Sequence, residues 1–358
     1  MKILRPLSML AIWLMLSANA VAQTPLLPPP GAPTPAAPVK KEMPKPKPAA
    51  VKKPAPAATP KPAATPAPTA TVVPAPAFDD PNVDLVFGAY QRGPYKTAFD
   101  LATNRAQFNG DPKAMTMLGE LYANGMGVKR DYAKAAEWYK RAGDGGDREG
   151  MFALAMLRLA GRGGAVNREE AVKLLASSAK LGNPKAAYNL ALLYLDGQTL
   201  PQDVRRAAEL LRVSADAGNP EAQYALATFY KEGTGVPKDI DKAVRLLQTA
   251  SLAGNVDAEV EYAIALFNGT GTPKNEAAAV ALLRKAARQN SPIAQNRLAR
   301  VLVSGLGAPI DKVEGLKWHI VAKTAGKGDP QLDEALAALT PEERATAQEA
   351  ARKWLGTK

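Results

Sequence analysis

The chain has 358 residues, of which 46% are hydrophobic and 22% charged, ordinary fractions for a soluble globular protein. Its formal net charge is +12, but Lys2, Arg5 and residues 23–77 carry eight of these charges, so residues 78–358 keep only +4 and we expect no nucleic-acid partner. The absence of cysteine excludes disulfides, thiolate zinc sites, a cysteine nucleophile and lipid attachment through cysteine.

Residues 1–22 have the pattern of a secretory signal peptide. Lys2 and Arg5 precede an apolar run from Leu7 to Leu16, and Ala20-Val21-Ala22 offers a small-x-small cleavage site, with Ala18-Asn19-Ala20 as an alternative. An uncleaved membrane anchor is the competing interpretation, but the run is shorter than the roughly 20 residues that span a bilayer. We therefore expect cleavage, no transmembrane anchor in the mature chain, and a periplasmic location in a Gram-negative bacterium.

Residues 23–77 form a Pro/Ala/Lys-rich segment with 18 prolines and no aromatic residue. Such a composition cannot bury enough apolar area to offset the entropy of ordering, so we expect a disordered linker. Its seven lysines face a single acidic residue, Glu42. Two interpretations stay open: an inert soluble tether, or a spacer whose lysines, such as Lys40 and Lys52, contact peptidoglycan or another anionic polymer.

The next segment, residues 78–110, is expected to be a capping helix pair. Its two helices lie within Pro81–Asn109 and are separated by a break at Gly93-Pro94, a dipeptide that interrupts helices.

Six consecutive copies of a 36-residue unit then fill residues 111–326. Two ladders of residues keep this step: Gly110, Gly146, Gly182, Gly218, Gly254, Asn290 and Gly326; and Gly125, Gly161, Gly197, Gly233, Gly269 and Gly305. A period of this size is typical of repeat architectures, in which no unit buries its core alone.

Each unit is predicted to be an antiparallel pair of helices, A and B. Helix A begins after a capping residue such as Asp111 and ends at the Gly125-type ladder, where a left-handed residue closes the last turn. Helix B begins after a second capping column, of which Asp131 is the first member, and ends near the Gly146-type ladder, where Asn290 is the residue that best tolerates a left-handed conformation. The sequence thus predicts an all-α, right-handed α-solenoid.

This pattern resembles the Sel-1-like repeat family, a relative of the tetratricopeptide repeat. The family's motif is matched in the first unit by Ala114, Leu118, Gly119, Tyr122, Gly125, Gly127, Val128, Asp131, Lys134, Ala135, Trp138, Tyr139, Ala142 and Gly146. The third unit departs from it, with Thr199 and Leu200 in place of Gly-Val, and in the fifth unit Tyr262 replaces the usual Leu. We expect these departures to affect local packing only.

Residues 327–358 are predicted to be C-terminal capping helices. Asp329-Pro330 and Thr340-Pro341 are helix starts, and Thr340 with Glu343 has the spacing of a capping box. We expect Trp354 and Leu355 to cover the last interface of the array.

No combination of residues in the sequence builds an active site, so we predict no enzyme, no catalytic residue, no metal site and no cofactor. His319 is the only histidine, and it occupies a column filled by Tyr139 and leucines in the other units, which favours a packed structural residue over a general base.

Binding is the function that the sequence favours. Solenoids expose an extended concave face lined by helix A. If the tetratricopeptide geometry holds, two columns lean onto that face, and their central members are the predicted partner-binding residues Phe152, Met156, Tyr188, Leu192, Tyr224 and Thr228. These residues could anchor an extended or helical peptide, or belong to ordinary core packing. Two hypotheses follow: a periplasmic scaffold or regulatory adaptor for an envelope protein, and a structural factor tethered to the cell wall or a polysaccharide.

Overall fold

A computed structural model describes residues 84–356, a range that contains sixteen helices and no strand. The predicted signal peptide, the predicted linker and residues 78–83 of the N-terminal cap lie outside the described residues. The remainder is the all-α stack of helix pairs that the repeat predicts.

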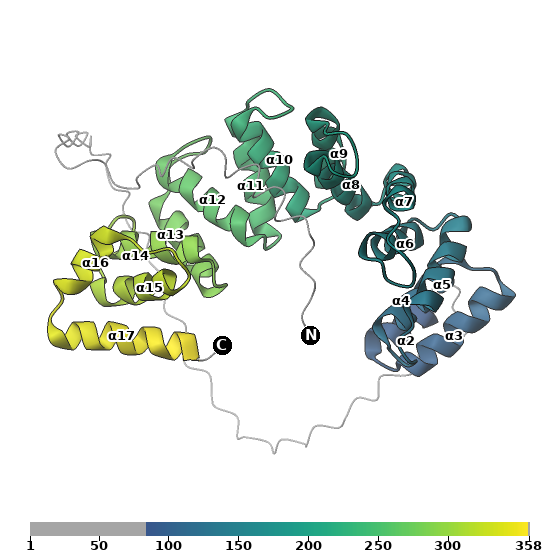
Figure 1. The fold of residues 1–358 in the computed structure, drawn as a ribbon. Helices are drawn as coiled ribbons and strands as arrows, with labels where there is room; N and C mark the ends of the chain where they lie inside the picture. Colours follow the sequence, from purple (N-terminus) through teal and green to yellow (C-terminus); the bar gives the residue numbers. More distant parts are fainter. Residues whose placement is uncertain (1–83, 357–358) are drawn as a thin grey trace, which may run out of the picture. The chain divides into compact units, whose positions relative to one another are not determined.

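The helices follow the 36-residue period (Figure 1). Before the array lie α2 (Leu85–Arg92) and α3 (Tyr95–Phe108). The six repeats are α4 (Pro112–Asn124) with α5 (Tyr132–Asp144), α6 (Arg148–Ala160) with α7 (Arg168–Lys180), α8 (Pro184–Asp196) with α9 (Val204–Asp216), α10 (Pro220–Glu232) with α11 (Ile240–Leu252), α12 (Val256–Asn268) with α13 (Glu276–Arg288), and α14 (Pro292–Ser304) with α15 (Lys312–Thr324). After the array lie α16 (Pro330–Ala337) and α17 (Pro341–Gly356).

The predicted capping residues set the helix boundaries. The Asp111 carboxylate accepts from the Lys113 N–H at 2.9 Å, and the Asp239 carboxylate accepts from the Lys242 N–H at the same distance, which satisfies donors of the first turn. Helix α4 ends at Gly125, whose φ is 69°. Asn290 has a φ of 66° and is the only non-glycine residue between 84 and 356 with a positive φ, which confirms its predicted conformation.

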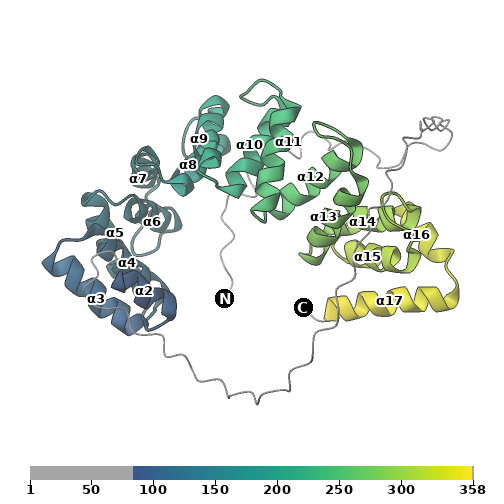
Figure 2. The same cartoon turned by 180° about the vertical axis from the view of Figure 1, so that it is seen from behind.

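Small residues let neighbouring helices approach closely. Helix A of each repeat packs on its own helix B, and helix B packs on the next helix A (Figure 2). Ala135 and its counterparts in α7, α9, α11 and α13 are fully or almost fully buried. A Cβ atom built on Gly119 of α4 would lie 2.5 Å from the Tyr139 ring of α5, so only glycine admits that ring.

Buried polar groups hold the two helices of one repeat together. The Ser178 hydroxyl of α7 donates to the Arg148 carbonyl at 2.7 Å, and the Ser214 hydroxyl of α9 donates to the Pro184 carbonyl at 2.7 Å. Each bond joins a helix B to the start of the helix A before it, at a carbonyl 30 residues upstream. Because the acceptor carbonyls belong to helix starts, these bonds also fix the position of each helix pair.

The C-terminal helices α16 and α17 pack against the last repeat. The Thr340 N–H donates to Glu343 at 3.0 Å and the Glu343 N–H donates to the Thr340 hydroxyl at 3.2 Å, a complete capping box. The Trp354 ring packs edge-on against Trp318 with 5.0 Å between ring centroids. Leu355, by contrast, remains 37% exposed and does not cover the interface.

Candidate partner-binding face

The six residues predicted to contact a partner lie on three consecutive A helices, and we call them the A-helix stripe. Two come from each of α6, α8 and α10, five and nine positions after the capping residue of the helix: Phe152 and Met156, Tyr188 and Leu192, and Tyr224 and Thr228.

Five of the six keep part of their surface exposed. Phe152, Tyr188 and Tyr224 are half-buried, each packed against a different cluster of the core. Met156 and Thr228 are also half-buried, and the Thr228 hydroxyl donates to the Tyr224 carbonyl at 3.2 Å.

Leu192 differs from the other members of the stripe. It is only 5% exposed and lies in the same core cluster on which Tyr188 packs. Its side chain therefore has little surface to offer a partner.

In α4, α12 and α14, residues at the same two positions of the helix are hydrogen-bonded, buried or ion-paired. In α4, the Thr116 hydroxyl donates to the Asp147 carboxylate at 2.6 Å. In α12, Val260 is 4% exposed. In α14, Arg300 forms an ion pair of 2.5 Å with Asp329, which is nearly fully buried. The partly exposed aromatic side chains of these columns are thus confined to the second, third and fourth repeats.

Charged groups flank the stripe on the side of α12. Burial, followed by the carboxylates of Glu261 and Asp257, raises the pKa of the Tyr224 hydroxyl well above its usual value. Burial and the Glu261 charge also raise the pKa of the Asp257 carboxyl. Lys231 of α10 neutralises part of this charge, with its ammonium nitrogen 3.1 Å from the Glu261 carboxylate.

Asp257 and Glu261 were not predicted as neighbours of Tyr224. Their i, i+4 spacing indicates that both lie on one face of α12. Their proximity to α10, however, depends on how the fourth and fifth repeats pack.

The structure places His319 in the core. Its ring is fully buried on α15, and its Nε2 atom lies 2.9 Å from the Asp333 carboxylate of α16, which also receives a hydrogen bond from Lys323 at 2.7 Å. Among residues 84–356, no group of three or more His, Asp or Glu side chains is arranged to hold a metal ion. None of the helices in this range combines the length and apolar character needed to cross a membrane.

Comparisons with known proteins agree with this architecture. The model of the Sel1 repeat matches residues 112–147, 148–183, 184–219, 220–255, 256–291 and 292–327, each one residue later than the unit read from the sequence. A Sel1 repeat protein from Oxalobacter formigenes is 26% identical, with a TM-score of 0.60 over 67% of this chain and 98% of its own.

A second solved structure is also similar. The protective antigen c5321 of uropathogenic Escherichia coli, which displays an SLR fold, is 26% identical, with a TM-score of 0.53 over 73% of this chain and 64% of its own. No curated protein sequence matches this chain.

Proposed function

The chain belongs to the Sel1 repeat family, and we propose that it is a non-enzymatic scaffold or regulatory adaptor that binds an extended or helical segment of a partner protein on the A-helix stripe. Sel1 repeat proteins generally mediate protein–protein interactions, and the family is typically non-enzymatic. The proposal assigns that role to a defined face of this chain.

The observation that carries the proposal is the placement of Phe152, Tyr188 and Tyr224. They occupy equivalent positions of three consecutive A helices and present partly exposed aromatic rings, whereas the flanking positions of the same column hold the smaller Thr116 and the buried Val260. Aromatic side chains supply a large contact area at low entropic cost and are enriched among residues that dominate binding energy. Because these three side chains are spaced one repeat apart, they suit a ligand that runs along several repeats.

We further propose that the scaffold works in the periplasm of a Gram-negative bacterium. The support is the signal-like pattern of residues 1–22 and the proline-rich composition of residues 23–77. N-terminal sequencing of the mature chain from a periplasmic fraction tests this; an intact Met1 or a cytoplasmic location would contradict it.

A second candidate function is attachment to the cell wall, favoured by the seven lysines and single glutamate of residues 23–77. Sedimentation with purified peptidoglycan is the test. Binding that disappears when residues 23–77 are deleted supports attachment through the linker, and binding that survives the deletion contradicts it.

The scaffold proposal is tested by capture of partners from envelope extracts with the full mature chain. Tyr188→Ala and Tyr224→Ala should each weaken capture by about tenfold or more, the effect of losing a residue that dominates binding. Since both changes also trim the core, Lys185→Glu, an exposed change one turn from Tyr188, serves as a variant that leaves packing intact.

The matched control is Val213→Ala on α9, which removes an apolar side chain that is 48% exposed on a helix B. Circular dichroism confirms that each variant keeps its helices. Unchanged capture by both tyrosine variants and by Lys185→Glu would contradict the proposed face.

A further inference from the structure

The loop between the two helices of the third repeat differs from the others at one position. In the other five repeats, the second residue after the glycine that ends helix A is also a glycine with positive φ: Gly127, Gly163, Gly235, Gly271 and Gly307. In the third repeat this residue is Thr199, which does not adopt a positive φ.

The five glycines bring their loop into contact with the preceding repeat. A Cβ atom built on Gly163 would lie 2.2 Å from the carbonyl oxygen of Tyr132, the first residue of α5, and one on Gly235 would lie 2.7 Å from the carbonyl oxygen of Val204, the first residue of α9. At the other three glycines the nearest atom lies 2.6 to 2.9 Å away and belongs to the first or second turn of the preceding helix, which is α3, α11 or α13. Because no side chain fits into these gaps, the contact depends on glycine.

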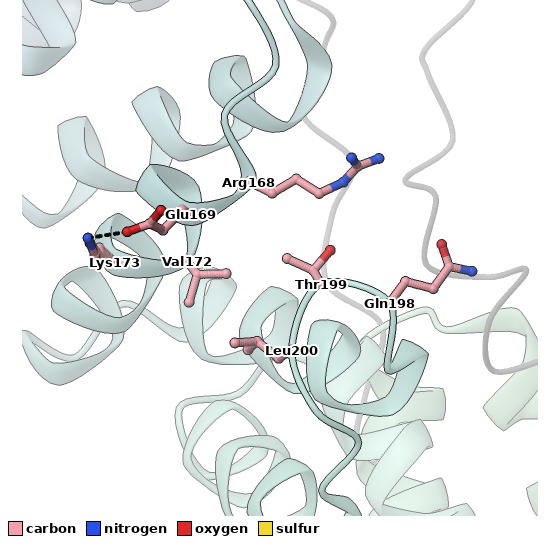
Figure 3. A pocket seen from close by; sticks show the side chains of 7 residues that line it. All are labelled: Arg168, Glu169, Val172, Lys173, Gln198, Thr199 and Leu200. Atoms are coloured by element: carbon pink, nitrogen blue, oxygen red, sulfur yellow. Dashed lines mark hydrogen bonds and ion pairs between the residues drawn. The ribbon is translucent and has the colours of Figure 1, made fainter.

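At Thr199 the loop cannot make this approach. By analogy with the other repeats, the loop would contact Arg168, the first residue of α7. Instead, Arg168 lines an open hollow of about 350 Å³ (Figure 3). Its lining comes from both repeats: Arg168, Glu169, Val172 and Lys173 of α7, and Gln198, Thr199 and Leu200 of the loop.

The backbone of the same loop is also held less firmly. The Gly197 N–H lies 3.4 Å from the Leu193 carbonyl oxygen, whereas the equivalent bond of Gly233 to Phe229 measures 2.8 Å.

From these observations we infer that the junction between α7 and α8 is a hinge in an array whose other repeat junctions are locked by glycine. The apolar core continues through the junction, since Leu175 of α7 and Leu190 of α8 belong to one buried cluster. The second and third repeats therefore stay packed at this core and bend about it. On the side of the junction where Gln198, Thr199 and Leu200 lie, the distance between the loop and α7 changes, and the hollow widens or narrows.

The position of the hinge has a consequence for the A-helix stripe. The junction separates Phe152 and Met156 on α6 from the tyrosines on α8 and α10. Bending there changes the spacing between the two parts of the stripe, so one surface adjusts to partner segments of different shape. Only this consequence rests on the proposed function; the hinge itself does not.

Spin labels on the full mature chain test the hinge directly, because the chain contains no cysteine that would compete for the label. Ala176→Cys with Arg212→Cys spans the α7–α8 junction at equivalent exposed positions of α7 and α9. Arg212→Cys with Gln248→Cys spans the next junction, where Gly235 is in place, at the same spacing. Pulsed electron resonance should give a broader distance distribution for the first pair than for the second.

Substitutions at the loop complete the test. Thr199→Gly should narrow the distribution of the first pair, and Gly235→Thr should broaden that of the second. Amide exchange provides an independent readout: residues 197–203 should exchange about tenfold or more faster than residues 233–239, and Thr199→Gly should remove the difference. Equal distributions for both pairs, or exchange that Thr199→Gly leaves unchanged, would overturn the hinge.

Discussion

Replacing Gly163 by alanine isolates the contribution of the contact between a loop and the preceding repeat. Gly163 has a φ of 73° and Gly146 a φ of 86°, so alanine at either position pays the cost of a left-handed conformation, about 1 to 2 kcal/mol. The two sites differ in space. Around Gly146 no atom lies within 4 Å of an added Cβ, whereas at Gly163 the Tyr132 carbonyl oxygen and carbon lie 2.2 and 2.6 Å away.

The atoms that an alanine at position 163 would meet belong to the backbone of α5 and cannot rotate aside. Forcing such an overlap costs about 1 to 3 kcal/mol in addition to the conformational term. We therefore expect Gly163→Ala to lower the free energy of unfolding by roughly 2 to 5 kcal/mol and Gly146→Ala by roughly 1 to 2 kcal/mol.

Urea unfolding followed by far-UV circular dichroism measures both variants against the wild type, with the free-energy change taken from the midpoint at constant slope. Because repeat arrays can unfold segment by segment, amide exchange in α5 and α6 supplies the local value. Equal losses for the two variants would refute the argument that close backbone approach locks the repeats.

Three further predictions follow from individual residues. Burial and the Glu261 charge raise the pKa of the Asp257 carboxyl in the folded state above its reference value of 3.8, so the stabilisation from the neutral carboxyl is complete below pH 3.8 and is lost as the pH rises through the folded-state pKa. Asp257→Asn should therefore raise the melting temperature at neutral pH and leave it unchanged at about pH 3. Calorimetry at the two pH values checks this. Asn290→Gly should change the free energy of unfolding by less than about 0.5 kcal/mol, and Asn290→Ala should lower it by about 1 kcal/mol, since the residue has a φ of 66°; equal urea midpoints for the two variants would contradict this. Ser178→Ala removes the hydroxyl that donates to the Arg148 carbonyl at 2.7 Å and should cost about 1 to 2 kcal/mol in the same assay, whereas Ser177→Ala, at an exposed neighbouring position, should cost less than about 0.5 kcal/mol.

The sequence predicts the helix pairs well because their boundaries depend on local chemistry. A capping carboxylate such as Asp131 has only to reach the N–H groups of its own first turn, and Asn290 has only to tolerate a left-handed backbone. These requirements repeat every 36 residues and need no knowledge of the tertiary structure.

Features that arise between repeats were harder to predict. The same helical spacing that places Leu192 beside Tyr188 does not show that Leu192 is 5% exposed, because its burial depends on how α8 packs against its neighbours. The approach of Asp257 to Tyr224 likewise crosses a repeat boundary. Thr199 was visible as a departure from the repeat, but the sequence does not show that it lines a hollow together with residues of α7.

Site-specific photocrosslinking tests the proposed binding face most directly. A photoreactive residue at Thr228, in the A-helix stripe, is compared with one at Val213, which lies 48% exposed on α9. We predict that Thr228 yields a crosslink to a partner protein in intact cell envelopes and that Val213 yields none. A crosslink to the same protein from Val213 alone, or equally from both positions, would contradict binding through the A helices.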